Sequence, residues 1–141
     1  MAHHCKAFIL HCMDFRLAIP MKEFLAKEEL LGTCDVVSVA GGVKDLISPD
    51  NPSDRDFILK QIDISANLHG AGQIIISNHT DCGAYGGSGK FASFNEERSF
   101  HTEEMKKAKA VIASKYPQLE IRMILGKISA SGEVSLEEIQ N

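Results

Sequence analysis

The chain has 141 residues, of which 44% are hydrophobic and 24% are charged, a composition typical of a globular domain and not of a disordered or fibrous protein. The net charge of −4 excludes a general attraction to nucleic acid or to anionic membranes. No apolar stretch approaches the roughly 20 residues that span a bilayer, and no secretory signal is evident. We therefore expect a single cytoplasmic domain over residues 1–141.

The first part of the chain predicts two strands joined by a helix. The apolar run Lys6–His11 has the length of a strand. Helical spacing of apolar residues follows from Pro20 onward, and Gly32 ends it. The run Asp35–Ala40 predicts a second buried strand, and the two glycines after it allow a tight turn or a close approach to a ligand.

The middle of the chain predicts a second helix and a third strand. Ser53 is a plausible helix N-cap, and we expect this helix to end near Gly70. The β-branched run Gln73–Asn78 predicts a strand that leads directly into polar residues. The glycine-rich segment Ala84–Lys90 predicts a flexible loop or lid, because it matches the phosphate-binding loop pattern only in part.

The remaining segments complete an α/β pattern. We expect a helix over Glu103–Ser114, a fourth strand over Glu120–Leu125 and a short hairpin around Gly132. Strands that alternate with helices indicate a doubly wound, mostly parallel sheet with helices on both faces. The predicted strand order is 2-1-3-4, with room for an extra edge strand at the C-terminal end.

Three ligand-type side chains follow the strands that flank the crevice of such a sheet. Cys12 follows the first strand, and His79 and Cys82 follow the third, so all three converge where ligands bind in doubly wound folds. Two thiolates and one imidazole suit zinc and leave a fourth position open, which indicates a catalytic zinc site. A structural zinc site fits less well, because the ligands do not form two local pairs.

Asp14 and Arg16 lie two and four residues beyond Cys12. Pairing with Arg16 keeps Asp14 ionised, which makes it a fixed hydrogen-bond acceptor. Such a carboxylate orients a nucleophile at the metal, or itself takes the fourth metal position.

The segments Cys12–Arg16 and His79–Gly83 resemble the Cys-x-Asp-x-Arg and His-x-x-Cys motifs of β-class carbonic anhydrases. The resemblance covers most of the chain, including an Ala-Gly turn at Ala40, and is closest to the small, minimal members. It implies that Cys12, His79 and Cys82 bind Zn²⁺ and that Asp14 and Arg16 form the catalytic dyad beside it. It further implies hydration of CO2 to bicarbonate by zinc-bound hydroxide, and a homodimer or a dimer of dimers.

Two departures from the family pattern keep other functions open. Ser38 and Val39 replace the usual Arg-Asn before the turn, which leaves open a non-catalytic zinc-binding dimer. Phe15 replaces a usually small residue and leaves open a related zinc enzyme that acts on COS or CS2. A thiol redox protein that uses Cys12 and Cys82 fits least, because a C-x-x-C motif is absent.

The other candidate residues are interpreted as packing or surface residues. Cys5 and Cys34 do not form, with any histidine or basic residue, a spacing that indicates a ligand pair or an activated thiol. His11 and His101 are more typical of packing or surface histidines than of proton relays. His3 and His4 receive no function.

Overall fold

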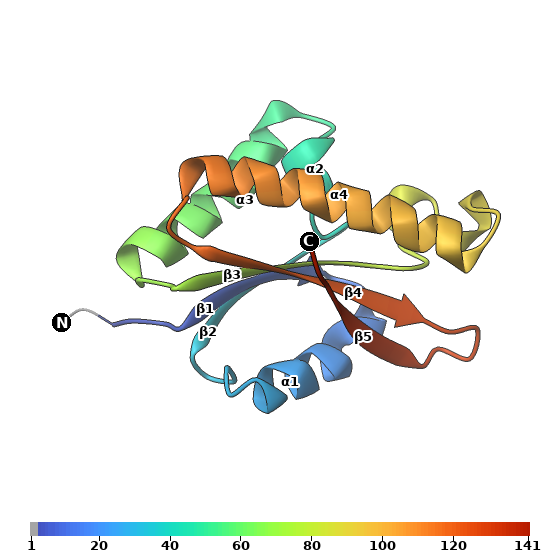
Figure 1. Ribbon diagram of the computed structural model, residues 1–141, viewed down its shortest axis with the longest axis horizontal. Helices are drawn as coiled ribbons and strands as arrows, with labels where there is room; N and C mark the ends of the chain where they lie inside the picture. The colour runs from blue at the N-terminus through green and yellow to red at the C-terminus, as the bar shows by residue number, and fades with distance from the viewer. Residues whose placement is uncertain (1–2) are drawn as a thin grey trace.

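The structure, a computed structural model, describes residues 3–141 and contains a five-stranded sheet (Figure 1). The strands are β1 (Ala7–Cys12), β2 (Cys34–Val39), β3 (Gln73–His79), β4 (Glu120–Ile128) and β5 (Val134–Ile139). Their order is β2-β1-β3-β4-β5; the first four are parallel and β5 pairs antiparallel with β4. This confirms the predicted doubly wound sheet and its C-terminal edge strand.

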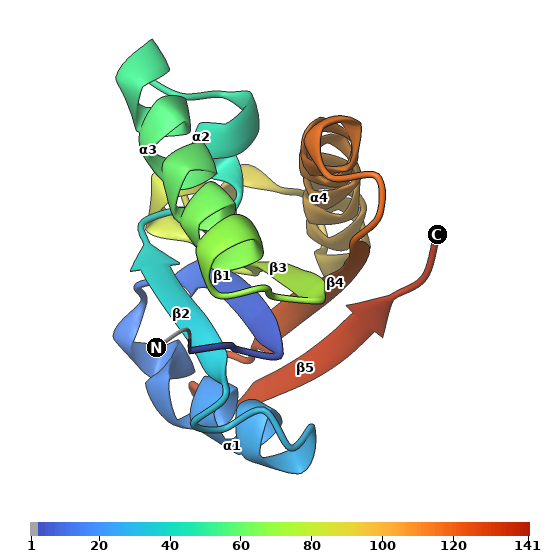
Figure 2. The same ribbon diagram turned by 90° about the vertical axis from the view of Figure 1, so that its left-hand side faces the viewer.

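Helices cover both faces of the sheet. The helices are α1 (Ala18–Lys27), α2 (Lys44–Ile47), α3 (Pro52–Asp63) and α4 (Phe94–Lys115). Figures 1 and 2 show α1 on one face and the other three helices on the opposite face. Among residues 3–141, no helix combines the length and the apolar character needed to cross a membrane.

The central strands are buried on both sides, which explains their uninterrupted apolar sequences. In β1, Phe8 and Leu10 pack with the core beneath α2, α3 and α4, whereas Ala7 and Ile9 pack with the core that includes α1 residues. A parallel strand between two helical layers needs apolar residues at every position rather than at alternate ones. The two cores hold β1 and β3 rigidly, and their carboxyl ends lie side by side.

Two helices differ from the prediction at their ends. The helix α4 begins at Phe94 rather than at Glu103, and the Ser93 hydroxyl caps it by accepting from the Glu96 N–H at 3.1 Å. Its first turns are rich in charged residues and so lack a clear apolar stripe. The helix α1 ends at Lys27 rather than near Gly32.

The segment from Asn51 to Gly70 also differs in detail. Asn51, not Ser53, is the N-cap of α3, and its backbone N–H donates to Asp54 at 3.4 Å. Beyond Asp63 the helix continues as one π turn, Ile64–Leu68, before the chain reverses toward β3. The glycine-rich segment predicted as a loop contains two short 3₁₀ turns.

Candidate metal centre and active site

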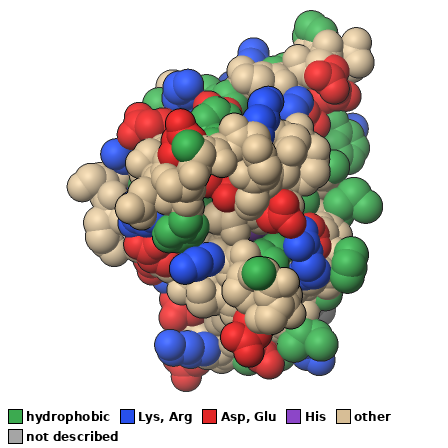
Figure 3. Space-filling model, turned by 90° about the vertical axis from the view of Figure 1, so that its right-hand side faces the viewer, with side chains coloured by type: hydrophobic (Ala, Val, Ile, Leu, Met, Phe, Trp, Pro, Cys, Tyr) green, Lys and Arg blue, Asp and Glu red, His purple; other side chains and the backbone are tan. Residues whose placement is uncertain are grey.

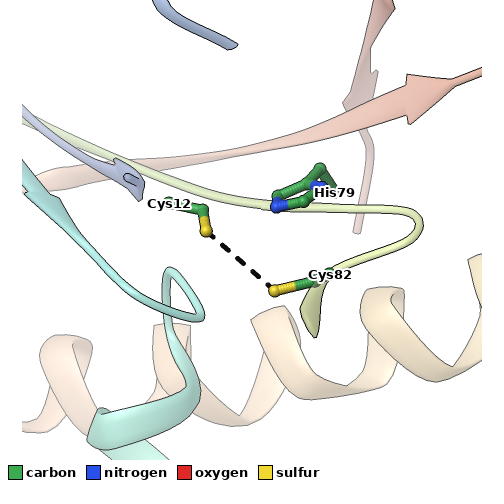
Figure 4. Close-up of side chains that lie close together, drawn as sticks. All are labelled: Cys12, His79 and Cys82. Carbon is green, nitrogen blue, oxygen red and sulfur yellow. Dashed lines mark hydrogen bonds between the residues drawn. The ribbon is translucent and has the colours of Figure 1, made fainter. Parts of the chain in front are cut away.

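The structure brings Cys12, His79 and Cys82 together. Cys12 and His79 are the last residues of β1 and β3, and Cys82 lies three residues farther on. Figure 4 shows the three side chains pointing toward one another, with the two sulfur atoms 4.0 Å apart. One donor atom from each residue lies within 4.8 Å of the others, and all three residues are buried.

The orientation of His79 leaves one ring nitrogen free for a ligand. Its Nδ1 atom donates to the backbone carbonyl of Thr80 at 2.6 Å, so Nε2 carries the lone pair. Within residues 3–141, Nε2 is buried and has no hydrogen-bond partner. A buried polar atom without a partner costs about 1–3 kcal/mol, and a metal ion at this position removes that cost.

The two thiols also suit a metal ion. Sulfur atoms bound to one tetrahedral zinc ion at about 2.3 Å lie roughly 3.8 Å apart, close to the observed 4.0 Å. The hydrogen bond with Cys82 lowers the pKa of Cys12 to about 4, and the same contact raises the pKa of Cys82. The pair thus holds one negative charge easily, and a cation is needed to hold two.

A glycine turn after the neighbouring strand β2 supports the Cys12 thiol. Gly41, after β2, donates its N–H to the Cys12 sulfur at 3.4 Å. Gly42 has a φ of 58° and would place a Cβ 2.3 Å from the Ser77 carbonyl oxygen. Only glycine fits this close approach, so the turn is fixed against the end of β3.

The Asp14 carboxylate is held on both oxygens by one residue. Arg16 donates through its backbone N–H and Nε to Oδ1, at 2.9 and 3.0 Å, and through Nη2 to Oδ2 at 2.7 Å. The Arg16 guanidinium lowers the pKa of Asp14 to about 2. Oδ2 lies 3.9 Å from Nε2 of His79, so an ionised acceptor faces the candidate metal position.

Sequence reasoning assigned no role to Asp81, which lies inside the His-x-x-Cys motif. Its carboxylate accepts from Nη1 of Arg16 at 3.1 Å, and its carbonyl accepts from Nη2 at 3.2 Å. Asp81 has a φ of 57°, and its N–H donates to the buried Glu97 at 2.8 Å. Asp81 therefore holds the Nη1–Nη2 edge of Arg16, next to the Nε–Nη2 edge that Asp14 holds. The residue Glu97 of α4 in turn holds Asp81 in place.

Asn78, Tyr85 and His101 form a buried cluster of polar side chains next to the site. The Asn78 amide lies 3.2 Å from the Tyr85 hydroxyl, to which it donates, and 3.0 Å from Nδ1 of His101. The side chain of His101 is fully buried, and burial lowers its pKa to about 4. Burial thus keeps His101 neutral, and His11 is also buried; neither histidine lies at the surface.

The residues that depart from the family pattern lie at or near the surface. Phe15 is 85% exposed, so its ring covers little of its own chain. Ser38 is exposed and Val39 is partly buried, near the end of the edge strand β2. Figure 3 shows the face on which the parallel strands end, with hydrophobic side chains gathered along its right-hand margin.

A family model described as "Putative carbonic anhydrase" matches residues 2–134. An uncharacterized protein of Rickettsia bellii is 29% identical over 126 residues, which are 87% of this chain and 77% of that protein. A second uncharacterized protein, from Rickettsia conorii, is 28% identical over 126 residues, which are 87% of this chain and 68% of that protein.

Solved structures share the fold. A carbonic anhydrase from Glaciozyma antarctica has a TM-score of 0.61 at 18% identity, with 96% of this chain and 83% of that chain covered. The β-carbonic anhydrase CcaA has a TM-score of 0.54 at 12% identity, with 99% of this chain and 85% of that chain covered. CafA of Aspergillus fumigatus, also a β-carbonic anhydrase, has a TM-score of 0.52 at 16% identity, with 98% of this chain and 76% of that chain covered.

Proposed function

Because this chain belongs to the carbonic anhydrase family and has the fold of the β class, we propose that it is a zinc-dependent lyase that reversibly hydrates CO2 to bicarbonate. One observation carries the proposal. The free Nε2 of His79 faces the Cys12 and Cys82 thiols on one side and the Asp14 carboxylate on the other.

Cys12, His79 and Cys82 would hold the zinc ion. Zinc, when bound, lowers the pKa of water to about 7, an effect for which carbonic anhydrases are the standard example. The Thr80 carbonyl fixes the His79 tautomer, and the Gly41 N–H supports the Cys12 thiolate. Both contacts orient the ligands before the metal binds.

Asp14 orients the nucleophile. With a pKa of about 2 it stays ionised at neutral pH, so it accepts a hydrogen bond rather than storing a proton. That hydrogen bond leaves the lone pair of the nucleophile aimed at the CO2 carbon. Because Arg16 engages both oxygens of Asp14, the carboxylate is held in one orientation beside the metal position.

We also propose that the chain works as a homodimer. Met13, Phe15 and Ile19, in or next to the segment that joins β1 to α1, are 64%, 85% and 69% exposed. Val36 on the edge strand β2 is 51% exposed. Exposed apolar side chains beside an unpaired strand edge favour association with a second copy.

The decisive experiment measures the stopped-flow rate of CO2 hydration per bound zinc, with the metal quantified on the same preparation. We expect a fast rate that chelation abolishes and added zinc restores. Stoichiometric zinc without hydration would contradict the proposal and favour the non-catalytic dimer. Turnover of COS or CS2 in place of CO2 would favour the related zinc enzyme instead.

A further inference from the structure

A second group of ligand-type side chains lies at the opposite end of the sheet. Cys5 lies two residues before β1 begins, Asp35 lies near the start of β2, and His69 follows the π turn at the end of α3. One donor atom from each lies within 4.8 Å of the others. Sequence reasoning missed this group because the three residues are 30 or more positions apart.

The Asp35 carboxylate is the centre of the group. Its Oδ2 atom lies 2.6 Å from Nδ1 of His69 and 3.4 Å from the Cys5 sulfur. The Cys5 sulfur also lies 3.6 Å from the hydroxyl of the buried Ser65. The side chains of His69 and Asp35 are 22% and 31% exposed, so solvent ions reach them.

Backbone contacts fix these donors in place. The Cys5 N–H donates to the His69 carbonyl at 2.9 Å, and the Lys6 N–H donates to the Thr33 carbonyl at 2.7 Å. Phe8 pairs with Asp35 in the parallel register of β1 and β2. The three residues are thus held by the segment before β1, by β2 and by a helix end, which reduces the entropy lost on binding a ligand.

This group is separate from the candidate active site. Cys5 and Cys12 lie at opposite ends of β1, and seven residues of extended chain span about 23 Å. An ion bound at one end therefore shares no ligand with an ion at the other.

We propose that Cys5, Asp35 and His69 form a second metal site, which binds one divalent ion of the zinc class. A thiolate, a carboxylate and an imidazole are all zinc ligands. The thiolate disfavours Mg²⁺ and Ca²⁺, which prefer oxygen ligands.

His3 is the outer partner of this site. Its Nε2 atom lies 2.9 Å from Nε2 of His69, and the two ring centroids are 4.6 Å apart. Nδ1 of His69 donates to Asp35 in the metal-free chain, so metal binding at Nδ1 replaces this hydrogen bond and leaves the ring proton on Nε2. The Nε2–H then donates to His3, as the second nitrogen of a ligating histidine donates to an outer partner. The bound ion joins the start of β1 to β2 and to the turn before β3, so it stabilises the folded chain by mass action.

The test is metal analysis of the whole chain after loading with Zn²⁺ and desalting against a weak chelator. We expect two zinc ions per wild-type chain, one in Cys5→Ala and one in His69→Ala. Cys34→Ala is the matched control, because Cys34 is also partly buried beside Asp35 but lies outside the group; it should retain both ions. His3→Ala should weaken the second site about 10- to 100-fold without removing it.

Two further measurements separate this site from the active site. His79→Ala should lose one zinc and keep the other, and zinc should still raise its Tm unless Cys5→Ala is added. In the wild-type background, Co²⁺ loading should give thiolate-to-metal absorption that falls in Cys5→Ala and is unchanged in Cys34→Ala.

Three results would overturn the proposal. The first is a single zinc per wild-type chain with Cys5→Ala unaffected. The second is equal loss in Cys5→Ala and Cys34→Ala. The third is loss of the second zinc on replacement of His3 and His4 but not of Cys5, which would place the ion on the two histidines alone. If His79→Ala fails to fold, the zinc content of Cys5→Ala compared with that of the wild type still tests the proposal.

Discussion

Nε2 of His79 and Oδ2 of Asp14 lie 3.9 Å apart, at the edge where β1 and β3 end side by side. A group bound at that nitrogen is therefore within reach of a carboxylate whose oxygens are already oriented by Arg16. The strand ends, rather than a mobile loop, set this spacing. Because Asp14 lies beside the candidate metal ligands and is not one of them, a substitution at Asp14 can test its role while metal binding is kept.

Asp14→Asn should lower the rate of CO2 hydration by about 100-fold or more while zinc content stays unchanged. Asparagine is similar in shape but lacks the negative charge that accepts the hydrogen bond and pairs with Arg16. The measurement is the hydration rate per bound zinc. Asp50→Asn is the control, because that side chain is 88% exposed; equal rates in the two variants would refute the role of Asp14.

The metal-free protein should lose stability in acid through Asp14. Because the folded pKa is lowered to about 2 from an unfolded value near 4, the contribution is present above pH 4 and is lost as the pH falls through 2. Its size is on the order of 2 kcal/mol. Urea unfolding of chelator-treated protein at pH 6 and pH 2.5 should show a smaller acid loss in Asp14→Asn than in wild type. Equal losses would mean that Asp14 is not held ionised in the folded chain.

The sequence was sufficient to predict the sheet order and the meeting of Cys12, His79 and Cys82, because local patterns mark the strands and the strand order then follows from the topology. Uninterrupted apolar runs mark the buried parallel strands, and the topology then determines where Cys12, His79 and Cys82 meet. The contact between Arg16 and Asp14 is likewise local in sequence. These features need no knowledge of distant packing.

The features that sequence reasoning missed depend on packing between distant segments. Glu97 supports Asp81 from α4, whose first turns are too polar to predict a helix. Cys5 packs against the core, as predicted, yet its thiol also lies beside Asp35, which is 30 residues away. Neither relationship has a spacing that a single sequence reveals.

Gly42→Ala should destabilise the chain more than Gly32→Ala. Both glycines have positive φ, 58° and 80°, so both variants carry a backbone cost of about 1–2 kcal/mol. Only at position 42 does the new Cβ meet other atoms, the Ser77 carbonyl at 2.3 Å and the Asn78 side chain at 2.7 Å. We expect an additional loss of about 1–3 kcal/mol in the free energy of unfolding, measured by urea denaturation.

Gly42→Ala should also weaken zinc binding, because the turn that this substitution displaces carries the Gly41 N–H bonded to Cys12. A Cβ added at Gly32 would meet no atom within 4 Å, so Gly32→Ala should bind zinc as the wild type does. Equal stability of the two variants would show that the turn at Gly42 tolerates displacement from the end of β3.

Asp81→Asn should reduce kcat severalfold without changing zinc content or KM. Asp81 contacts Arg16 and is not placed to contact the reacting atoms, so its effect should pass entirely through the position of Arg16 and Asp14. In that case the substitution should have no further effect once Asp14 is already asparagine, because coupled residues are not additive. Hydration rates of the two single variants and the double variant test this. Equal effects of Asp81→Asn in both backgrounds would show that Asp81 acts independently of the Asp14–Arg16 pair.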